Sequence, residues 1–241
     1  MWVKEMEKLY AIIPAYNEQD NIRNVINEWY DIIVSTGEES RLVIINDGST
    51  DGTFAIMQEE ASQKPALVVL SKENSGHGAT VLFGYRYALD NGADYVFQTD
   101  SDGQTLPSEF DMFYKRRHDY PFIIGRRSGR KDGMFRIITT RVLQYVVRVV
   151  FGVSLKDINT PYRLMSRELL EDCLRFIPEG FNLSNVVLTV AAARRHYRGL
   201  FIPITFRKRQ GGKNSINPKK IVKIGIAAVR DFRRINSKLL D

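Results

Sequence analysis

The first half of the chain alternates short apolar runs with longer amphipathic segments, and this alternation constrains the fold more than any other feature. The apolar runs are rich in β-branched residues and are expected to be buried strands, while the longer segments have the apolar spacing of helices. We predict strands at residues 9–14, 42–46, 66–70, 95–99 and 122–125, and helices at residues 17–34, after residue 51, and at residues 78–91. Strands that alternate with helices predict an α/β fold with a mostly parallel, Rossmann-like sheet and helices on both faces.

Polar residues at the ends of these segments predict where the helices begin and end. Asn17 or Asp20 is expected near the start of the first helix, and Ser49 and Asp51 are expected to cap the second. Gly92 follows the third helix and fits a position where a left-handed backbone is common. We see no internal repeat or low-complexity tract in the sequence.

The residues that directly follow the predicted strands are nearly all polar or charged. In a doubly wound sheet, ligands bind beyond the carboxyl ends of the strands, so the fold would gather these residues at one edge. They occupy positions 16–18, 47–49, 73–75, 100–102 and 126–127. The sequence therefore predicts a polar ligand site at that edge.

Residues 98–104 read Q-T-D-S-D-G-Q and are the most informative of these segments. Side chains alternate along an extended chain, so Asp100, Asp102 and Gln104 are expected to face the same way. Three oxygen donors suit a hard divalent cation such as Mg²⁺ or Mn²⁺, which proteins usually share with substrate phosphates. A polar loop or a helix cap is an equally good interpretation of this segment taken alone.

Two other strand ends fit nucleotide binding. In N-D-G-S-T-D-G-T at residues 46–53, the glycines permit a tight turn near a ligand, and Asp47 could accept hydrogen bonds from a base or a ribose. A helix cap with a turn is the alternative there. Residues 14–18, P-A-Y-N-E, could hold the nucleoside, and Gly76-His77-Gly78 is a weak phosphate-binding signal at the start of a helix.

Together these segments resemble family 2 glycosyltransferases. The matching pieces, in chain order, are IIPAYNE (12–18), INDGSTDGT (45–53), NSGHGA (74–79), QTDSDGQ (98–104), GRR (125–127), DINTPYR (157–163), P-I-x-F-x-x-R (203–209) and GGKNS (211–215). The resemblance covers nearly the whole chain and is closest to the polyprenyl-phosphate sugar transferases, of the dolichol-phosphate mannose synthase kind. It implies a GT-A-type fold, a nucleotide-sugar donor and a divalent metal.

The resemblance also implies roles for individual residues. The nucleotide contacts that it implies are Pro14, Tyr16, Glu18, Asp47, Gly76, Asp100 and Ser101. The metal ligands that it implies are Asp100, Asp102 and Gln104. The resemblance also implies a set of groups near the diphosphate and the acceptor, which are Asp102, Arg127, Asp157, Arg163, Arg209 and Lys213.

The implied reaction is an inverting transfer from a UDP- or GDP-sugar to a lipid-linked acceptor, with polyprenyl phosphate preferred. A phosphate is already an oxyanion at neutral pH and needs no general base, whereas a sugar hydroxyl does. Asp157 is the candidate base downstream of the metal motif, and a helix or turn cap is its alternative role. Transfer to a sugar hydroxyl in polysaccharide or glycolipid synthesis therefore stays open.

The second half of the chain is basic. We expect a glycosyltransferase domain at residues 1–210 and a basic amphipathic helix within residues 211–241. Along residues 218–238, a helical wheel separates two sets, which are Lys219, Lys223, Arg230, Arg233 and Arg234 on one side and Ile221, Ala228, Val229, Phe232 and Ile235 on the other. This pattern is typical of helices on anionic membrane surfaces, and also of a surface helix packed on the core.

Residues 135–153 are also strongly apolar but contain three arginines. We expect this segment to pack against the first helix or to dip into lipid. The longest stretch without a formal charge, residues 180–193, is too short and too polar for a spanning helix, so none is predicted.

The net charge of +7 favours anionic partners, and Cys173 is the single cysteine. With no apolar signal core at the N-terminus, these features predict a cytoplasmic protein at the inner membrane face. A nucleic-acid-binding protein is the non-enzyme alternative suggested by charge, but no reader motif is present, so no nucleic acid is expected as a partner. An inactive nucleotide-sugar-binding module is another. The oligomeric state is not predicted.

Two other enzyme classes are disfavoured by the segment that follows the first strand. A nucleotidyltransferase needs a glycine-rich basic loop there, and a Rossmann dehydrogenase needs G-x-G-x-x-G. The chain has A-Y-N-E-Q-D-N at residues 15–21 instead.

Overall fold

The structure is a computed structural model that describes residues 7–127, 134–155, 157–207 and 229–239, with only the backbone described at residues 134–139. Within these residues a sheet of seven strands runs in the order β3-β2-β1-β4-β6-β5-β7. The strands are β1 (Leu9–Ala15), β2 (Arg41–Asp47), β3 (Leu67–Lys72), β4 (Tyr95–Gln98), β5 (Phe122–Arg127), β6 (Arg163–Ser166) and β7 (Gly199–Ile204).

The sheet is mostly parallel, as the alternation of strands and helices predicts. β1 pairs in parallel with β2 and β4, and β5 pairs in parallel with β7. β6 is inserted between β4 and β5 and is antiparallel to both. The first five strands were expected, whereas β6 and β7 were not. β6 was missed because it is short and begins with an arginine.

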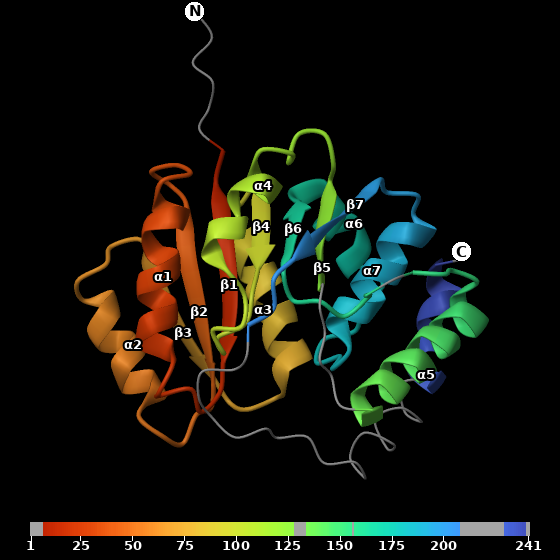
Figure 1. Cartoon of the computed structure of the whole chain (residues 1–241), viewed down its shortest axis with the longest axis horizontal. Helices are drawn as coiled ribbons and strands as arrows, with labels where there is room; N and C mark the ends of the chain where they lie inside the picture. Colours follow the sequence, from red (N-terminus) through yellow and green to blue (C-terminus); the bar gives the residue numbers. More distant parts are fainter. Residues whose placement is uncertain (1–6, 128–133, 156, 208–228, 240–241) are drawn as a thin grey trace, which may run out of the picture.

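Helices cover both faces of the sheet (Figure 1). They are α1 (Ile22–Val34), α2 (Thr53–Ala61), α3 (His77–Asp90), η1 (Pro107–Glu109), α4 (Asp111–Tyr114), α5 (Met134–Phe151), α6 (Arg167–Leu174), α7 (Ser184–Arg194) and a helix at residues 229–239. The two cores follow from the period-two alternation of strand side chains. In β1, Leu9 and Ile13 join the core under α1, whereas Tyr10 and Ile12 join the core under α3.

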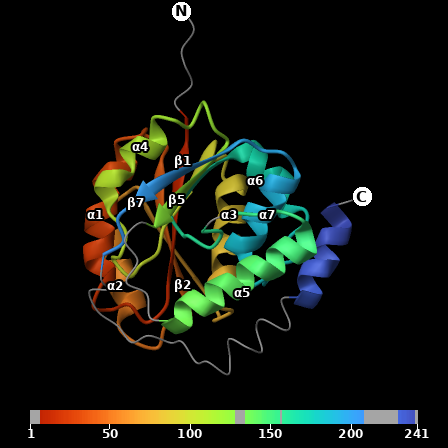
Figure 2. The ribbon, with the colours of Figure 1, turned by 45° about the vertical axis from the view of Figure 1, so that its right-hand side comes forward.

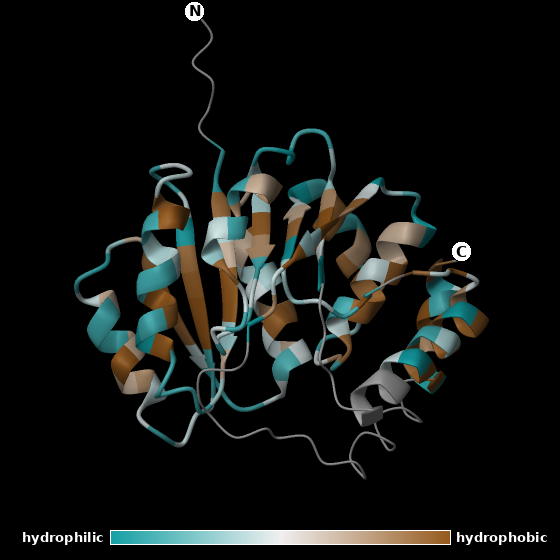
Figure 3. Cartoon of the chain, viewed as in Figure 1, coloured by the Kyte–Doolittle hydropathy of each residue, from teal (hydrophilic) through white to brown (hydrophobic). Residues whose placement is uncertain are grey.

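The hydropathy of the elements agrees with this layering. Figure 3 shows hydrophobic residues along β1 and β2 in the middle of the molecule, while α1 and α2 alternate hydrophobic and hydrophilic bands. Trp29 on α1 is 2% exposed and its ring centroid lies 5.2 Å from that of Phe97 on β4. Truncating such a buried aromatic side chain typically costs about 3–5 kcal/mol, so this contact fixes α1 to the sheet.

The starts of the first two helices differ in detail from the sequence prediction. α1 begins at Ile22, because Asn17 has a left-handed φ of 53° and the residues after it form a turn. The Glu18 carbonyl accepts hydrogen bonds from the backbone nitrogens of Asn21 and Ile22. At α2 the N-cap is Gly52 and no side chain caps the helix, so the prediction that Ser49 and Asp51 cap it is wrong, although Asp51 Oδ1 accepts the backbone N–H of Thr53 at 3.0 Å.

The apolar segment at residues 135–153 forms α5, but it does not pack against α1. Val147 and Phe151 of α5 belong to the core on the other face of the sheet, with α3 and α7. The helix at residues 229–239 lies beside α5 (Figure 2), and the ring centroids of Phe151 and Phe232 are 5.4 Å apart. The alternative of packing against the first helix is therefore wrong.

The basic C-terminal helix is described over residues 229–239 alone. Phe232 and Ile235 are 0% and 1% exposed, so at these positions its apolar face is packed on the core. Lys219, Ile221, Lys223 and Ala228 lie outside the described residues. Among the described residues, no helix has both the length and the apolar character needed to cross a membrane.

Candidate active site

The loops that follow β1 and β2 are joined at the carboxyl edge of the sheet. The backbone nitrogen of Asn17 donates to Ser49 Oγ at 3.0 Å, and the backbone nitrogen of Thr50 donates to Asn17 Oδ1 at 2.8 Å. Gln19 Oε1 accepts the backbone N–H of Gly52 at 2.9 Å. The two strand ends predicted to hold a nucleoside thus form one continuous wall, and Ser49 supports that wall.

The predicted nucleoside contacts after β1 divide into exposed and buried groups. Tyr16 is 45% exposed, whereas Glu18 is 6% exposed and accepts a hydrogen bond of 2.7 Å from Asn21 Nδ2. Pro14 lies within β1, in register with Ile45 of β2. Tyr16 is therefore the side chain that this loop offers to a ligand, while Glu18 stabilises the turn before α1.

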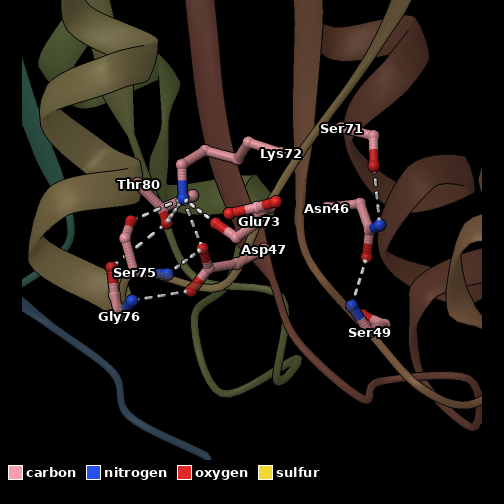
Figure 4. A network of polar contacts seen from close by, with 9 residues as sticks. All are labelled: Asn46, Asp47, Ser49, Ser71, Lys72, Glu73, Ser75, Gly76 and Thr80. Carbon is pink, nitrogen blue, oxygen red and sulfur yellow. Dashed lines mark hydrogen bonds and ion pairs between the residues drawn. The ribbon is translucent and has the colours of Figure 1, made fainter.

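Asp47, at the end of β2, is the centre of a polar network (Figure 4). Its Oδ1 accepts hydrogen bonds from Lys72 Nζ at 2.6 Å and from the backbone nitrogen of Ser75 at 3.0 Å. Its Oδ2 accepts the backbone N–H of Gly76 at 3.0 Å. Lys72 also donates to Ser75 Oγ at 2.5 Å. Asp47 thus holds the loop that leads into α3.

The charge state of Asp47 follows from these contacts. Burial alone would raise the pKa of the Asp47 carboxyl, but hydrogen bonds from Lys72 and the Ser75 backbone outweigh it and hold this pKa below its ordinary value. The buried carboxylate is therefore ionised at neutral pH and paired with a cation. The sequence prediction missed Lys72, although its place at the end of β3 was a signal that could have found it.

The start of α3 approaches a distant loop closely. A Cβ on Gly76, whose φ is +89°, would lie 2.7 Å from Asn182 Oδ1, and one on Gly78 would lie 2.2 Å from the Asn182 carbonyl oxygen. A side chain at position 78 would collide with the backbone of that loop, whereas at position 76 the Asn182 side chain would have to move and the positive φ itself favours glycine. The glycines of the weak phosphate-binding signal thus have a defined packing role, and Asn182 joins the site without any sequence signal.

The acidic motif follows β4 at the same edge. Asp100 Oδ1 is buried without a hydrogen-bond partner, and His77 Nε2 lies 3.7 Å away, beyond hydrogen-bonding distance. Asp102 Oδ1 accepts the backbone N–H of Gln104 at 3.1 Å, and Ser101 is 6% exposed. A buried carboxylate oxygen that accepts no hydrogen bond is a candidate contact for a bound cation or an ordered water.

The segment after β7 is joined to the acidic motif. Gln104 Nε2 donates to the Arg207 carbonyl at 2.9 Å, and the Arg207 backbone nitrogen donates to the Gln104 carbonyl at 2.7 Å. Thr105 and Phe206 form an isolated antiparallel bridge. The Phe206 ring centroid lies 5.4 Å from the guanidinium carbon of Arg127 at the end of β5. Contacts therefore connect the acidic motif to Arg127.

Arg127 and Asp157 form a two-point ion pair. Arg127 Nη2 lies 2.7 Å from Asp157 Oδ1, and its Nε lies 3.3 Å from Oδ2, which also accepts the Arg127 backbone N–H at 2.9 Å. Burial alone would raise the pKa of Asp157, but the hydrogen bonds and charge of Arg127 outweigh it and lower this pKa. A carboxylate with a lowered pKa is a weak base.

Comparison with known proteins identifies the family. Residues 10–174, which include β1 to β6 and the acidic motif, match the model for Glycosyl transferase family 2. The chain belongs to glycosyl transferase family 2. The resemblance read from the sequence motifs is thereby confirmed.

Two curated proteins are similar over nearly the whole chain. The undecaprenyl-phosphate mannosyltransferase of Micrococcus luteus is 26% identical over 87% of this chain and 88% of its own length. The polyprenol monophosphomannose synthase of Mycolicibacterium smegmatis is 26% identical over 91% of this chain and 84% of its own length.

A solved glycosyltransferase structure has the same fold. The glucosyl-3-phosphoglycerate synthase of Mycobacterium tuberculosis, crystallised with Mn²⁺ and uridine-diphosphate-glucose, aligns with a TM-score of 0.65 and 17% identity. The alignment covers 96% of this chain and 79% of that one. The expected GT-A-type architecture is confirmed at the level of the fold.

One arginine of the family 2 motifs is buried beneath this edge, where it pairs with Gln98, the last residue of β4. Arg163 is 0% exposed, and its guanidinium donates to the carbonyl oxygens of Thr160, at 2.6 Å from Nη2, and of Asn185, at 3.1 Å from Nη1. Burial lowers its pKa to about 10, which keeps it protonated at neutral pH. Because backbone carbonyls surround the guanidinium, Arg163 stabilises the core here and is not presented to a diphosphate.

The structure thus brings together most of the predicted site residues. Contacts connect Asp47 to Gly76, place His77, the first residue of α3, near Asp100, and connect Gln104 through Arg207 and Phe206 to Arg127. Arg209 and Lys213 lie outside the described residues.

Proposed function

We propose that this family 2 glycosyltransferase is a metal-dependent, inverting enzyme that transfers a sugar from a UDP- or GDP-sugar to polyprenyl phosphate. The observation that carries the proposal is the acidic motif at the carboxyl edge of the sheet. There Asp100 keeps a buried oxygen without a hydrogen-bond partner, close to the start of α3.

The residues at this motif fit a hard divalent cation. In the part of the chain that the structure describes, no three His, Cys, Asp or Glu side chains gather to hold a metal. A cation here would therefore be held by Asp100, Asp102 and the side-chain oxygen of Gln104, with the substrate phosphates completing its shell. Such sharing is usual for Mg²⁺ and Mn²⁺. When bound, the ion neutralises the charge that develops on the leaving diphosphate.

The nucleoside would bind against the wall formed by the loops after β1 and β2. Tyr16 offers an exposed aromatic ring, and Asp47 arranges the loop at Gly76 through backbone hydrogen bonds. We infer that Asp47 recognises the nucleoside chiefly by shaping this pocket. Asp47→Ala is therefore expected to weaken the free nucleoside diphosphate and the sugar nucleotide equally.

If the acceptor is a phosphate, the protein does not have to remove a proton from it. A phosphate oxygen attacks the anomeric carbon, the bond to the nucleoside diphosphate breaks, and the configuration inverts. Arg127, held by Asp157, is placed to stabilise the charge on the transferring groups. Arg209 and Lys213 would add to this stabilisation.

The two similar curated proteins support polyprenyl phosphate as the acceptor, since both are named for sugar transfer to such lipids. The lowered pKa of Asp157 agrees with an acceptor that needs no base. We propose that the enzyme works as a peripheral protein at the cytoplasmic membrane face, with a catalytic domain at residues 1–210 and a basic helix within residues 211–241.

The test uses the purified full chain. A thermal-shift screen of UDP- and GDP-sugars with Mn²⁺ selects the donor, and the donor is then incubated with undecaprenyl phosphate in detergent. A chloroform-soluble glycolipid that is stable to phosphatase and labile to mild acid supports the proposal. Transfer to a saccharide but not to the lipid phosphate would replace it with the hydroxyl-acceptor alternative.

A further inference from the structure

α5 has a second apolar face that is open to solvent. Val142, Tyr145 and Val149 are 56%, 69% and 65% exposed, although valines and tyrosines are ordinarily much less accessible. Their spacing of three and four residues places them in one stripe on the helix. Val147 and Phe151, each 1% exposed, point to the core instead. The stripe is therefore not the packing face of α5.

Cations border this stripe. Arg141 and Arg148, adjacent in the chain to Val142 and Val149, are exposed on α5, and α5 contains no acidic residue. The neighbouring helix at residues 229–239 packs on α5 through Phe232. It exposes Arg230, Arg233, Arg234 and Lys238. An apolar stripe among cations is the pattern of a helix that lies in the surface of an anionic bilayer.

The position of α5 relates the stripe to the site. β5 ends at Arg127, and α5 begins at Met134 further along the chain. Figure 1 draws the beginning of α5 at the lower side of the molecule, where β1 and β2 also end. A bilayer that contacts α5 would thus lie beside the edge at which an acceptor phosphate has to arrive.

We propose that Val142, Tyr145 and Val149 of α5 enter the headgroup region of an anionic membrane while Arg141 and Arg148 bind lipid phosphates. The reason for docking rests on the proposed lipid acceptor, but the contact itself is independent of sugar transfer. Tyrosine suits this depth because its ring is apolar and its hydroxyl reaches water. In this arrangement the helix at residues 229–239 contributes charge, because its Phe232 and Ile235 are buried.

The test is vesicle flotation of the full chain without donor or metal. Vesicles contain phosphatidylcholine alone or phosphatidylcholine with phosphatidylglycerol. We expect flotation with the anionic vesicles that falls as salt rises, since exposed charges are screened over about 10 Å at 0.1 M. Val142→Ser, Tyr145→Ser and Val149→Ser together should lower the bound fraction at least about tenfold, because the apolar anchor is lost. Arg141→Gln with Arg148→Gln should weaken binding to anionic vesicles alone.

Matched controls separate this stripe from general surface effects. Phe83→Ser removes another exposed apolar side chain, and Lys115→Gln with Arg175→Gln removes two exposed cations elsewhere. These variants should float like the wild type, and thermal unfolding checks that every variant is folded.

A second measurement reports depth directly. Tyr145→Cys can be labelled with an environment-sensitive fluorophore, since Cys173 is buried. A blue shift with anionic vesicles supports the proposal. Three outcomes would each overturn it. The apolar triple variant could float as well as the wild type, or the wild type could fail to float. The third is a dimer of the wild type in light scattering that the triple variant does not form. Docking without transfer to undecaprenyl phosphate would leave this proposal standing and refute the proposed acceptor.

Discussion

Asp47 and Lys72 are the last residues of neighbouring strands, and they face each other in register across β2 and β3. Their side chains meet at 2.6 Å, with 4% and 19% of each side chain exposed, respectively. The ion pair therefore joins the ends of β2 and β3 and holds the loop that leads into α3. The proposed donor site therefore depends on Lys72, a residue that need not touch the donor.

Replacing Lys72 by methionine should destabilise the fold, because the buried Asp47 carboxylate loses its cation. Removing one partner of a buried pair typically costs about 3–5 kcal/mol, and we expect the lower end since two backbone N–H groups remain. Urea denaturation measures the loss. Lys115→Met, which breaks an exposed pair with Asp111, should cost less than about 1 kcal/mol. Equal losses in both variants would contradict the role given to Lys72.

The contribution of Asp47 to stability should depend on pH in a defined direction. Its folded-state pKa is held below the ordinary value of 3.8, so the unfolded chain binds the proton first as pH falls. The stabilisation is complete above that ordinary pKa and is lost as pH falls through the folded-state pKa. The difference in free energy of unfolding between wild type and Asp47→Asn should therefore shrink from about pH 5 downward. A difference that grows in acid would refute this assignment.

Asp100→Asn should remove the metal-supported part of nucleotide binding. The change keeps the side-chain shape but removes the charge from the buried oxygen, so affinity for a nucleoside diphosphate with Mn²⁺ should fall about 100-fold, or about 2.7 kcal/mol. Calorimetry with and without EDTA measures it, and Asp102→Asn should behave alike. Asp90→Asn, at the far end of α3, is the control. Metal-supported affinity that survives in Asp100→Asn would exclude the proposed ligand set.

Asp157→Asn distinguishes a base from a positioning residue. If Asp157 only holds Arg127, the turnover number should fall about tenfold and the pH profile should keep its shape, since the acceptor phosphate needs no base. Arg127→Gln added to Asp157→Asn should then cost little more, because the two residues act through one ion pair. A loss of about 10²–10⁴-fold together with a lost acidic limb of the profile would show that Asp157 is a general base.

The parts of the fold that were predictable depend on local patterns. The first five strands are runs of β-branched and apolar residues, and burial on both faces of a parallel sheet requires such runs. β6 could not be found this way, because Arg163 is buried by carbonyls from other segments such as Asn185. Its antiparallel direction depends on a connection that passes through α5 and back, which no local pattern records.

The site was predictable as a set of strand ends but not as a set of contacts. Asp100, Asp102 and Gln104 stay predicted ligands, chosen because oxygen donors alternate directly after a strand, but residues 101–103 form a turn and not the extended chain on which their shared facing was argued. The left-handed turn at Asn17 was missed, because Ser49 and Thr50 from another loop stabilise it. The partner of Asp47 depends on the register between β2 and β3, and register is a property of the assembled sheet.

The bridge between Thr105 and Phe206 has a consequence for the folding of the chain during translation. The acidic motif is translated in the first half of the chain, but the strand-like segment that closes against it follows β7. Chains fold from the N-terminal side as they emerge, so β1 to β4 can assemble while this segment is still unmade. A nascent chain arrested before residue 206 would therefore carry the carboxylates without the segment that pairs with Thr105, and the proposed donor site would be complete only after that segment has been translated.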